Sequence, residues 1–143
     1  MDKWDKRFME LATTVASWSR DPSTKVGSVI VDSKKRIVGV GYNGLPRGAE
    51  DNDRIEKRPE KYEYVIHAEI NSLLNTTVDP EGCTLYATLV PCRQCIGAMA
   101  QKGISKVVFI PPNEEQGKRW NMDESISYLN EVGISWSVFK EAV

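Results

Sequence analysis

The first twenty residues carry an apolar pattern with helical spacing. Five large apolar side chains recur at intervals of three or four residues and fall on one helical face: Trp4, Phe8, Leu11, Val15 and Trp18. Such spacing predicts an amphipathic helix. The pattern stops at Asp21-Pro22, because proline disfavours helical backbone in the residue before it.

Two β-branched runs follow, at residues 26–31 and 36–42, and the polar stretch "DSKK" separates them. Short β-branched runs on either side of a polar turn predict an antiparallel hairpin. From "NGLPRG" to Lys61 the chain is rich in charge, and we interpret this segment as a solvated flap.

The second half of the chain alternates helices and strands. A helix is predicted from about His67 to Leu74, and strands at 84–89, 106–110 and 134–138 with further helices between them. The side chains expected to point inward are, in chain order, Ile70, Leu73 and Leu74, then Ile96, Met99 and Ala100, then Met122, Ile126, Leu129 and Val132.

Proline and glycine mark the ends of these helices. Pro91 suits the start of the second one, and Gly103 suits its left-handed C-terminal cap, as Gly133 does for the last. A strand, helix, strand, helix, strand order implies parallel pairing through right-handed crossovers. We therefore expect one α/β domain over residues 1–143. Its three α/β/α layers would enclose a mixed five-stranded sheet with an antiparallel opening hairpin and parallel later strands.

Composition narrows the class of partner. The 143 residues are 41% hydrophobic and 27% charged, and 19 basic residues against 20 acidic ones give a formal net charge of −1. The chain lacks the positive excess that drives binding to a nucleic-acid polymer, so a small substrate is favoured. No apolar run approaches the roughly 18 residues that span a bilayer, and the N-terminus lacks a signal-peptide core. We expect a cytoplasmic protein without a membrane partner.

The chain has one histidine, His67, and three cysteines, of which Cys92 and Cys95 are three residues apart. A Cys-x-x-Cys pair alone also fits a redox site, and a lone histidine is more often structural. Together these three side chains suit zinc, and a three-ligand set leaves the fourth tetrahedral position open, as in catalytic zinc sites. Cys83 has no such context, and we expect it to pack in the core.

Glu69 stands two residues after His67, and a carboxylate beside a metal site can carry a proton between water and a substrate nitrogen. His67-Ala68-Glu69 followed by Pro91-Cys92-Arg93-Gln94-Cys95 also matches H-x-E and P-C-x-x-C, the known signature of zinc-dependent nucleobase deaminases. The predicted helix starts add partial positive charge that favours the thiolate form.

The chain resembles the deoxycytidylate deaminase family within the wider cytidine deaminase superfamily. The resemblance is carried by "DPSTKVGSVIV" (21–31), "IVGVGYNGLPRG" (37–48), "YVIHAEINSLLN" (64–75), "PCRQC" (91–95) and "GISKVVF" (103–109). It implies a cytidine deaminase-like fold with Zn²⁺ held by His67, Cys92 and Cys95. Some family members hold a second zinc with further His and Cys residues, and because this chain has only Cys83 left over, we expect one Zn²⁺ per subunit. The resemblance also implies hydrolysis of dCMP to dUMP and ammonia. That reaction would supply dUMP for thymidylate synthesis, with Glu69 protonating N3 of the ring and helping the amino group leave.

The resemblance also implies substrate contacts. Asn43 matches an asparagine that binds the sugar, and the backbone at Ala68 a group that reads the pyrimidine edge. Lys25 matches a position near the phosphate, and Trp120 matches an aromatic residue that can stack on the base. Arg119, beside Trp120, is a candidate phosphate partner. Three of these residues have an ordinary alternative: Asn43 as part of an Asn-Gly turn, Lys25 as a solvated charge, and Trp120 as a subunit contact.

Family members also form homohexamers that dCTP activates and dTTP inhibits, so we expect a homo-oligomer and an allosteric nucleotide with Mg²⁺ near the "GYNGLPRG" loop and the flap. Two other functions stay open. The first is deamination of another base, in tRNA adenosine or a free nucleoside. The second is a structural zinc module in a binding protein, which would need a fourth ligand and no Glu69.

Overall fold

The computed structural model describes residues 2–50, 53–56, 60–117 and 121–140. Its helices are α1 (Lys3–Ala16), α2 (Glu60–Tyr64), α3 (Ala68–Leu74), α4 (Arg93–Gln101), α5 (Glu114–Gly117) and α6 (Met122–Val132), with a 3-10 helix η1 (Asp53–Glu56). Its strands are β1 (Gly27–Val31), β2 (Ile37–Tyr42), β3 (Thr84–Ala87), β4 (Lys106–Phe109) and β5 (Ser135–Val138). None of the helices in the described ranges has both the length and the apolar character needed to cross a membrane.

The five strands form one mixed sheet in the order β2-β1-β3-β4-β5. β1 pairs antiparallel with β2 and with β3, whereas β3, β4 and β5 are parallel. Parallel neighbours need a crossover connection, and α4 and α6 supply the two crossovers. The predicted hairpin and the predicted parallel half are both confirmed.

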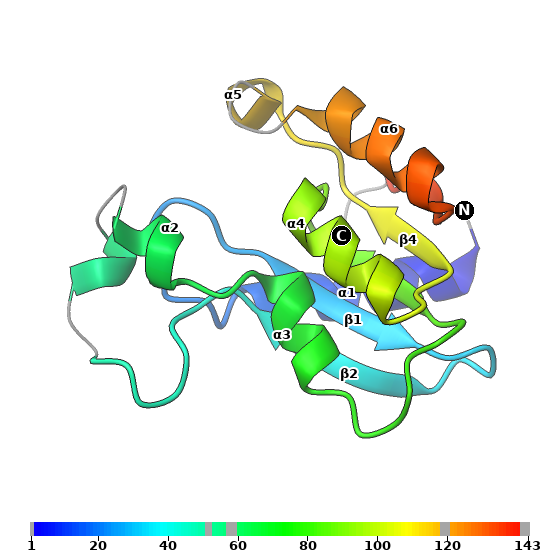
Figure 1. Cartoon of the computed structure of the whole chain (residues 1–143), viewed down its shortest axis with the longest axis horizontal. Coiled ribbons are helices and arrows are strands. Elements are labelled where there is room, and N and C mark those ends of the chain that lie inside the picture. The colour runs from blue at the N-terminus through cyan, green and yellow to red at the C-terminus, as the bar shows by residue number, and fades with distance from the viewer. Residues whose placement is uncertain (1, 51–52, 57–59, 118–120, 141–143) are drawn as a thin grey trace.

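Helices cover both faces of the sheet, as expected for three layers (Figure 1). α1 lies behind the sheet, where Phe8, Met9 and Ala12 pack against one set of strand residues. α3, α4 and α6 lie in front, where Leu73, Ile96, Met99 and Leu129 share a core with the other set. Cys83 is buried in this front core, in agreement with a packing role.

Glycines let two helices approach the sheet at backbone distance. A Cβ added at Gly41 in β2 would lie 2.4 Å from the backbone nitrogen of Ser72 in α3, and one at Gly39 would lie 2.6 Å from the oxygen of that residue. A Cβ at Gly27 in β1 would lie 2.0 Å from the carbonyl oxygen of Ala12 in α1. Real Cβ atoms do not come so close. β2 therefore admits α3 in this position only because Gly39 and Gly41 lack a side chain.

Two asparagines fasten α3 to the same strand. The Nδ2 atoms of Asn71 and Asn75 donate hydrogen bonds of 2.8 and 2.9 Å to the carbonyl oxygens of Tyr42 and Val40. Together with the glycine contacts, these bonds fix where α3 begins. Both α3 and α4 begin on the side of the molecule that faces α2 (Figure 1).

Several expectations about helix ends were wrong. α1 ends at Ala16, so Trp18 lies beyond it, 56% exposed, with its ring edge-on to that of Tyr42. Leu74 is 68% exposed, because α3 buries its Ala68, Ser72 and Leu73 side against the sheet and the last residue turns away. Pro91 does not begin α4, which starts at Arg93.

The glycines predicted to end two helices do so, since Gly103 after α4 and Gly133 after α6 both have positive φ. The flap was interpreted wrongly in part, because it contains η1 and α2. Ile55 and Lys61 are buried within it. The described flap is therefore packed against the rest of the protein rather than solvated throughout.

Candidate metal centre and active site

Three side chains from two helix starts meet at one point. The Nδ1 atom of His67 lies 3.3 Å from Sγ of Cys95 and 3.4 Å from Sγ of Cys92. All three ligand atoms lie within 4.8 Å of one another, and they form the one such group of His, Cys and acidic residues found among the described residues.

The donor set and its spacing fit zinc. Zn–S bonds of about 2.3 Å and Zn–N bonds of about 2.05 Å at tetrahedral angles place nitrogen and sulfur about 3.6 Å apart, close to the distances here. Three protein ligands leave one coordination position for water or substrate. A structural site would need a fourth protein ligand, which the cluster does not contain.

Local sequence explains why the ligands converge. His67 and Cys92 are the N-cap residues of α3 and α4, both with extended backbone, so each side chain projects from the start of its helix. Sγ of Cys92 also accepts a hydrogen bond of 3.4 Å from the backbone N–H of Cys95. The spacing of three residues then turns both sulfurs toward the same side of α4.

Proton sharing within the cluster favours one thiolate. Hydrogen bonds from Cys95 and His67 lower the pKa of Cys92 to about 4 despite burial. The hydrogen bond to Cys92 also raises the pKa of His67, and the same contact between the thiols, with burial, raises the pKa of Cys95. Binding of a divalent metal displaces these protons, since the ligand forms are thiolate and neutral imidazole.

Glu69 lies beside this cluster in the first turn of α3 and is 4% exposed. Burial raises the pKa of its carboxyl group to about 7, which suits a group that takes and returns a proton near neutral pH. Its backbone carbonyl accepts a 2.8 Å hydrogen bond from the hydroxyl of Ser72, and that hydroxyl lies 2.9 Å from the hydroxyl of Ser28 in β1. These contacts anchor the first turn of α3 to the sheet.

A cavity of about 200 Å³ opens next to Glu69. Its walls are formed by Asp21, Thr24, Val26, Asn43, Lys61, Tyr62, Val65, His67, Ala68, Glu69, Leu89, Val90 and Cys92. The structure thus brings Asn43, Ala68, Glu69 and two of the three sequence-predicted metal ligands to one cavity. Cys95 is buried directly behind it, in contact with His67.

The remaining predicted contacts are placed differently. Lys25 is exposed and is not among the residues that line the cavity. Arg119 and Trp120 lie outside the described residues. The side chain of Asn43 accepts a 2.9 Å hydrogen bond from the N–H of Val26 and donates one of 2.9 Å to the carbonyl of Thr24, so it shapes the loop that precedes β1.

Sequence reasoning missed one wall of the cavity, formed by Asp21 and by Lys61, Tyr62 and Val65 from α2 and the residue after it. The sequence marked Asp21 as a helix stop and as the first residue of the stretch 21–31 that carries the resemblance, without a contact of its own, and Lys61 as one charge among many in the flap. Neither belongs to a spaced motif, and 40 residues separate them. Only the fold shows that their side chains meet.

A three-layer α/β fold that carries this ligand set beside a buried glutamate defines the class of zinc-binding deaminases. Residues 2–111 match the protein family described as the cytidine and deoxycytidylate deaminase zinc-binding region. The chain belongs to this family.

Individual relatives point to the same family. A protein of Aliivibrio fischeri named "Uncharacterized deaminase in luxG 3'region" is 42% identical over 127 residues, which cover 89% of this chain and 86% of that protein. Human deoxycytidylate deaminase is 40% identical over 115 residues, covering 76% of this chain and 65% of the human protein. The chain therefore spans just under two thirds of that relative.

Among solved structures, the apo crystal structure of dCMP deaminase from cyanophage S-TIM5 superimposes with a TM-score of 0.78 at 25% identity. The alignment covers 97% of this chain and 100% of the phage chain. This match confirms the cytidine deaminase-like fold over nearly the whole length.

Proposed function

We propose that this protein catalyses zinc-dependent hydrolytic deamination of dCMP to dUMP and ammonia. The observation that carries the proposal is the buried Glu69 carboxyl group at the wall of a cavity that His67 and Cys92 also line. Relatives named deoxycytidylate deaminase at 40% identity support dCMP as the substrate. Supply of dUMP for thymidylate synthesis would follow from this reaction.

His67, Cys92 and Cys95 would hold one zinc ion per subunit. Bound there, zinc supplies a Lewis acid that lowers the pKa of water from about 15.7 to about 7. Glu69 accepts the proton that water releases and delivers it to N3 of the cytosine ring. It then takes the remaining proton of the hydroxyl group added at C4 and passes it to the departing amino group, so that ammonia leaves and C4 becomes a carbonyl. Its burial keeps the proton away from bulk solvent.

The cavity walls would orient the nucleotide. The backbone N–H of Ala68 is the first of α3 and, like all N–H groups in a first helical turn, lacks a partner within the helix, so it suits an oxygen or nitrogen on the pyrimidine edge. Asn43 would contact the sugar while it holds the loop before β1. For the phosphate we retain Lys25 and Arg119, and Trp120 as the residue that stacks on the base.

Regulation and assembly belong to the same proposal. A second cavity lies over Trp18, Arg20, Tyr42, Ile55 and residues 43–49. It is the candidate site for dCTP or dTTP with Mg²⁺, and Asn43 lines both cavities. We propose one deaminase domain over 1–143, assembled as a homohexamer. A cytoplasmic location agrees with three free cysteines, which a reducing compartment preserves.

Turnover measured side by side on dCMP, dCTP, deoxycytidine and a tRNA anticodon hairpin tests the substrate. We expect the highest kcat/KM on dCMP. A preference for deoxycytidine or for the adenosine of the hairpin would replace dCMP by that substrate. Zinc retention without turnover of any of them would favour a structural zinc module in a binding protein.

A further inference from the structure

A buried ion pair closes the cavity opposite the metal ligands. The Nζ atom of Lys61 in α2 lies 3.1 and 3.2 Å from the two carboxylate oxygens of Asp21 and donates a hydrogen bond of 2.7 Å to the hydroxyl of Ser23. The side chains of Lys61 and Asp21 are only 6% and 5% exposed. Charges buried to this extent persist only where they are paired and hydrogen-bonded.

Asp21 is held in turn by the loop that it caps. Its Oδ1 atom accepts hydrogen bonds from the backbone N–H groups of Ser23 and Thr24, and its own N–H donates to the hydroxyl of Ser19. That hydroxyl also donates to the carbonyl of Asn43. The carboxylate is therefore a fixed point on the loop before β1, and Lys61 fastens α2 to it.

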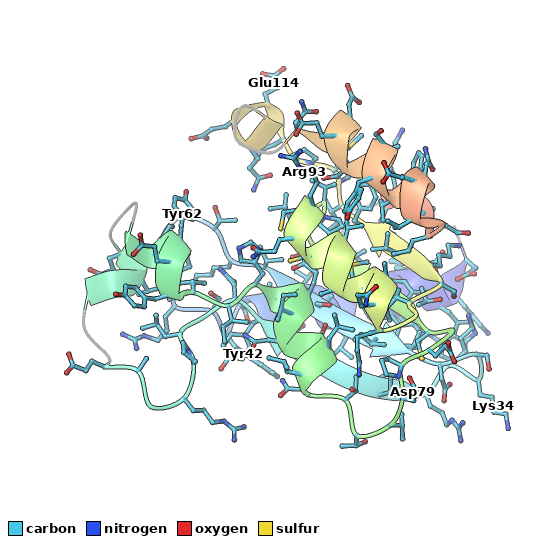
Figure 2. The ribbon with its side chains drawn as sticks, in the orientation of Figure 1. Lys34, Tyr42, Tyr62, Asp79, Arg93 and Glu114 are labelled. Carbon is cyan, nitrogen blue, oxygen red and sulfur yellow. The ribbon has the colours of Figure 1, made fainter. Side chains whose placement is uncertain are left out.

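α2 connects directly to the catalytic machinery. Tyr62 and Val65 line the cavity, and His67 follows two residues after Val65. Figure 2 shows Tyr62 on α2, across from the end of α4 where Arg93 lies. The segment is also tied by a bridge in which Ile66 and Gly44 exchange backbone hydrogen bonds of 2.8 and 3.1 Å.

We propose that Lys61 and Asp21 are positioning residues that hold α2 as a wall of the nucleotide cavity and so set the affinity for the substrate. This inference rests on the proposed function. The pair is not a phosphate anchor, although Lys61 is the one lysine or arginine among the described residues of the cavity wall. The three ammonium protons already face Asp21 and Ser23, and the carboxylate cancels the positive charge that would attract an anion.

The first test does not depend on catalysis. The N–H of Val65 donates to the carbonyl of Lys61, and that of Ile66 to Gly44, so hydrogen exchange at these two amides reports on the position of α2. Lys61→Met should speed their exchange at least about tenfold and leave α4 unchanged. Lys34→Met, at the exposed hairpin turn, is the matched control and should change neither. Unchanged exchange in Lys61→Met would overturn the proposal.

The second test separates positioning from phosphate binding. In Lys61→Met, KM should rise about tenfold or more for both dCMP and deoxycytidine, while kcat per bound zinc stays within about threefold. The ratio of kcat/KM for the two substrates should therefore be preserved. A ratio that falls by tenfold or more would mean that Lys61 contacts the phosphate, and the proposal would be wrong.

The third test separates positioning from stability. A single substitution leaves one buried charge uncompensated, so Asp21→Asn and Lys61→Met should each lower the melting temperature, and the double variant should recover much of that loss. The double variant should keep the raised KM. Lys61→Arg, which retains the charge, should have a KM between that of the wild type and that of Lys61→Met. If KM recovers together with the melting temperature, the pair supplies stability alone and the proposal fails.

Failure of the proposed function would be seen separately. A wild-type protein that turns over neither dCMP nor deoxycytidine would refute the assignment as a dCMP deaminase and the role of the pair in binding that substrate. The exchange measurement would still decide whether Asp21 and Lys61 hold α2 in place.

Discussion

The two sides of the cavity are built in different ways. The metal side stands on α3, which touches β2 through backbone atoms at Gly39 and Gly41. The opposite side, α2, is tied by the Lys61–Asp21 ion pair, and the bridge between Ile66 and Gly44 follows it in the chain. The first side is thus fixed by close packing and the second by buried charge. We expect them to fail differently when they are perturbed, through steric overlap on one side and through loss of charge compensation on the other.

The largest effect should come from the metal side itself. Cys95→Ala should reduce bound zinc from about one per chain to below about a tenth, because two ligands bind zinc far more weakly than three.

Glu69→Gln should keep zinc and fold, yet lower kcat by roughly 10²- to 10⁴-fold, since an amide cannot relay a proton. Zinc content and dCMP turnover of the same preparations give both results. A Glu69→Gln enzyme within about tenfold of wild type would refute the assigned role.

The next effect tests close packing. Gly41→Ala places a Cβ 2.4 Å from the Ser72 nitrogen and 2.7 Å from the Asn71 carbonyl carbon, both backbone atoms that cannot rotate away. We expect a loss of more than about 2 kcal/mol in the free energy of unfolding, measured by denaturant titration.

Gly97→Ala is the matched control for Gly41→Ala. Gly97 lies within α4, and apart from its chain neighbours and the nearby backbone of its own helix no atom lies within 4 Å of an added Cβ. Because alanine favours helix over glycine, it should stabilise the protein by about 0.5 to 1 kcal/mol. Similar losses in both variants would show that α3 does not depend on the close approach at β2.

The smallest effect concerns how the stability contributed by the Lys61–Asp21 pair, on the α2 side of the cavity, depends on pH. Burial alone would raise the pKa of Asp21, but hydrogen bonds from the N–H groups of Thr24 and Ser23 and from Lys61 outweigh it and hold the pKa below its usual value of 3.8. A carboxyl group whose pKa is lower in the folded protein than in the unfolded chain stabilises the folded state at pH values above the unfolded pKa. That contribution is lost as the pH falls through the folded pKa.

The stability advantage of the wild type over Asp21→Asn should therefore shrink between about pH 5 and pH 2. Thermal unfolding of both proteins across that range measures it. An advantage that does not change with pH would mean that folding leaves the pKa of Asp21 at its unfolded value, so that its partners do not favour the ionised form.

These two sides also differ in how far the sequence could predict them. The ligand types at fixed spacing, each at a helix start, pointed to His67, Cys92 and Cys95, and the fold brings these side chains together. The strand pattern and the glycines that end α4 and α6 predicted the antiparallel hairpin, the parallel later strands and most element positions, but not the antiparallel pairing of β1 with β3. Periodicity failed at Leu74 and Trp18, because it describes a helix face without showing where the neighbouring layer ends.

Lys61 shows why the rest was not predictable. Lysine in a charged stretch is usually solvated, and nothing local distinguishes one that will meet an aspartate 40 residues earlier. Burial of a charge depends on which distant group compensates it, and that information exists only in the folded chain. The same holds for Gly39 and Gly41, whose purpose is visible only once α3 lies against them.

The asparagine bonds from α3 to β2 have a consequence for how copies of this chain can meet. β2 lies at the end of the sheet, and an end strand with free carbonyl groups is a template on which a strand from another molecule can form. Here the carbonyl oxygens of Val40 and Tyr42 already accept hydrogen bonds from Asn75 and Asn71. A strand from another molecule could therefore pair with β2 at these two positions only by displacing the hydrogen bonds that hold α3 against the sheet.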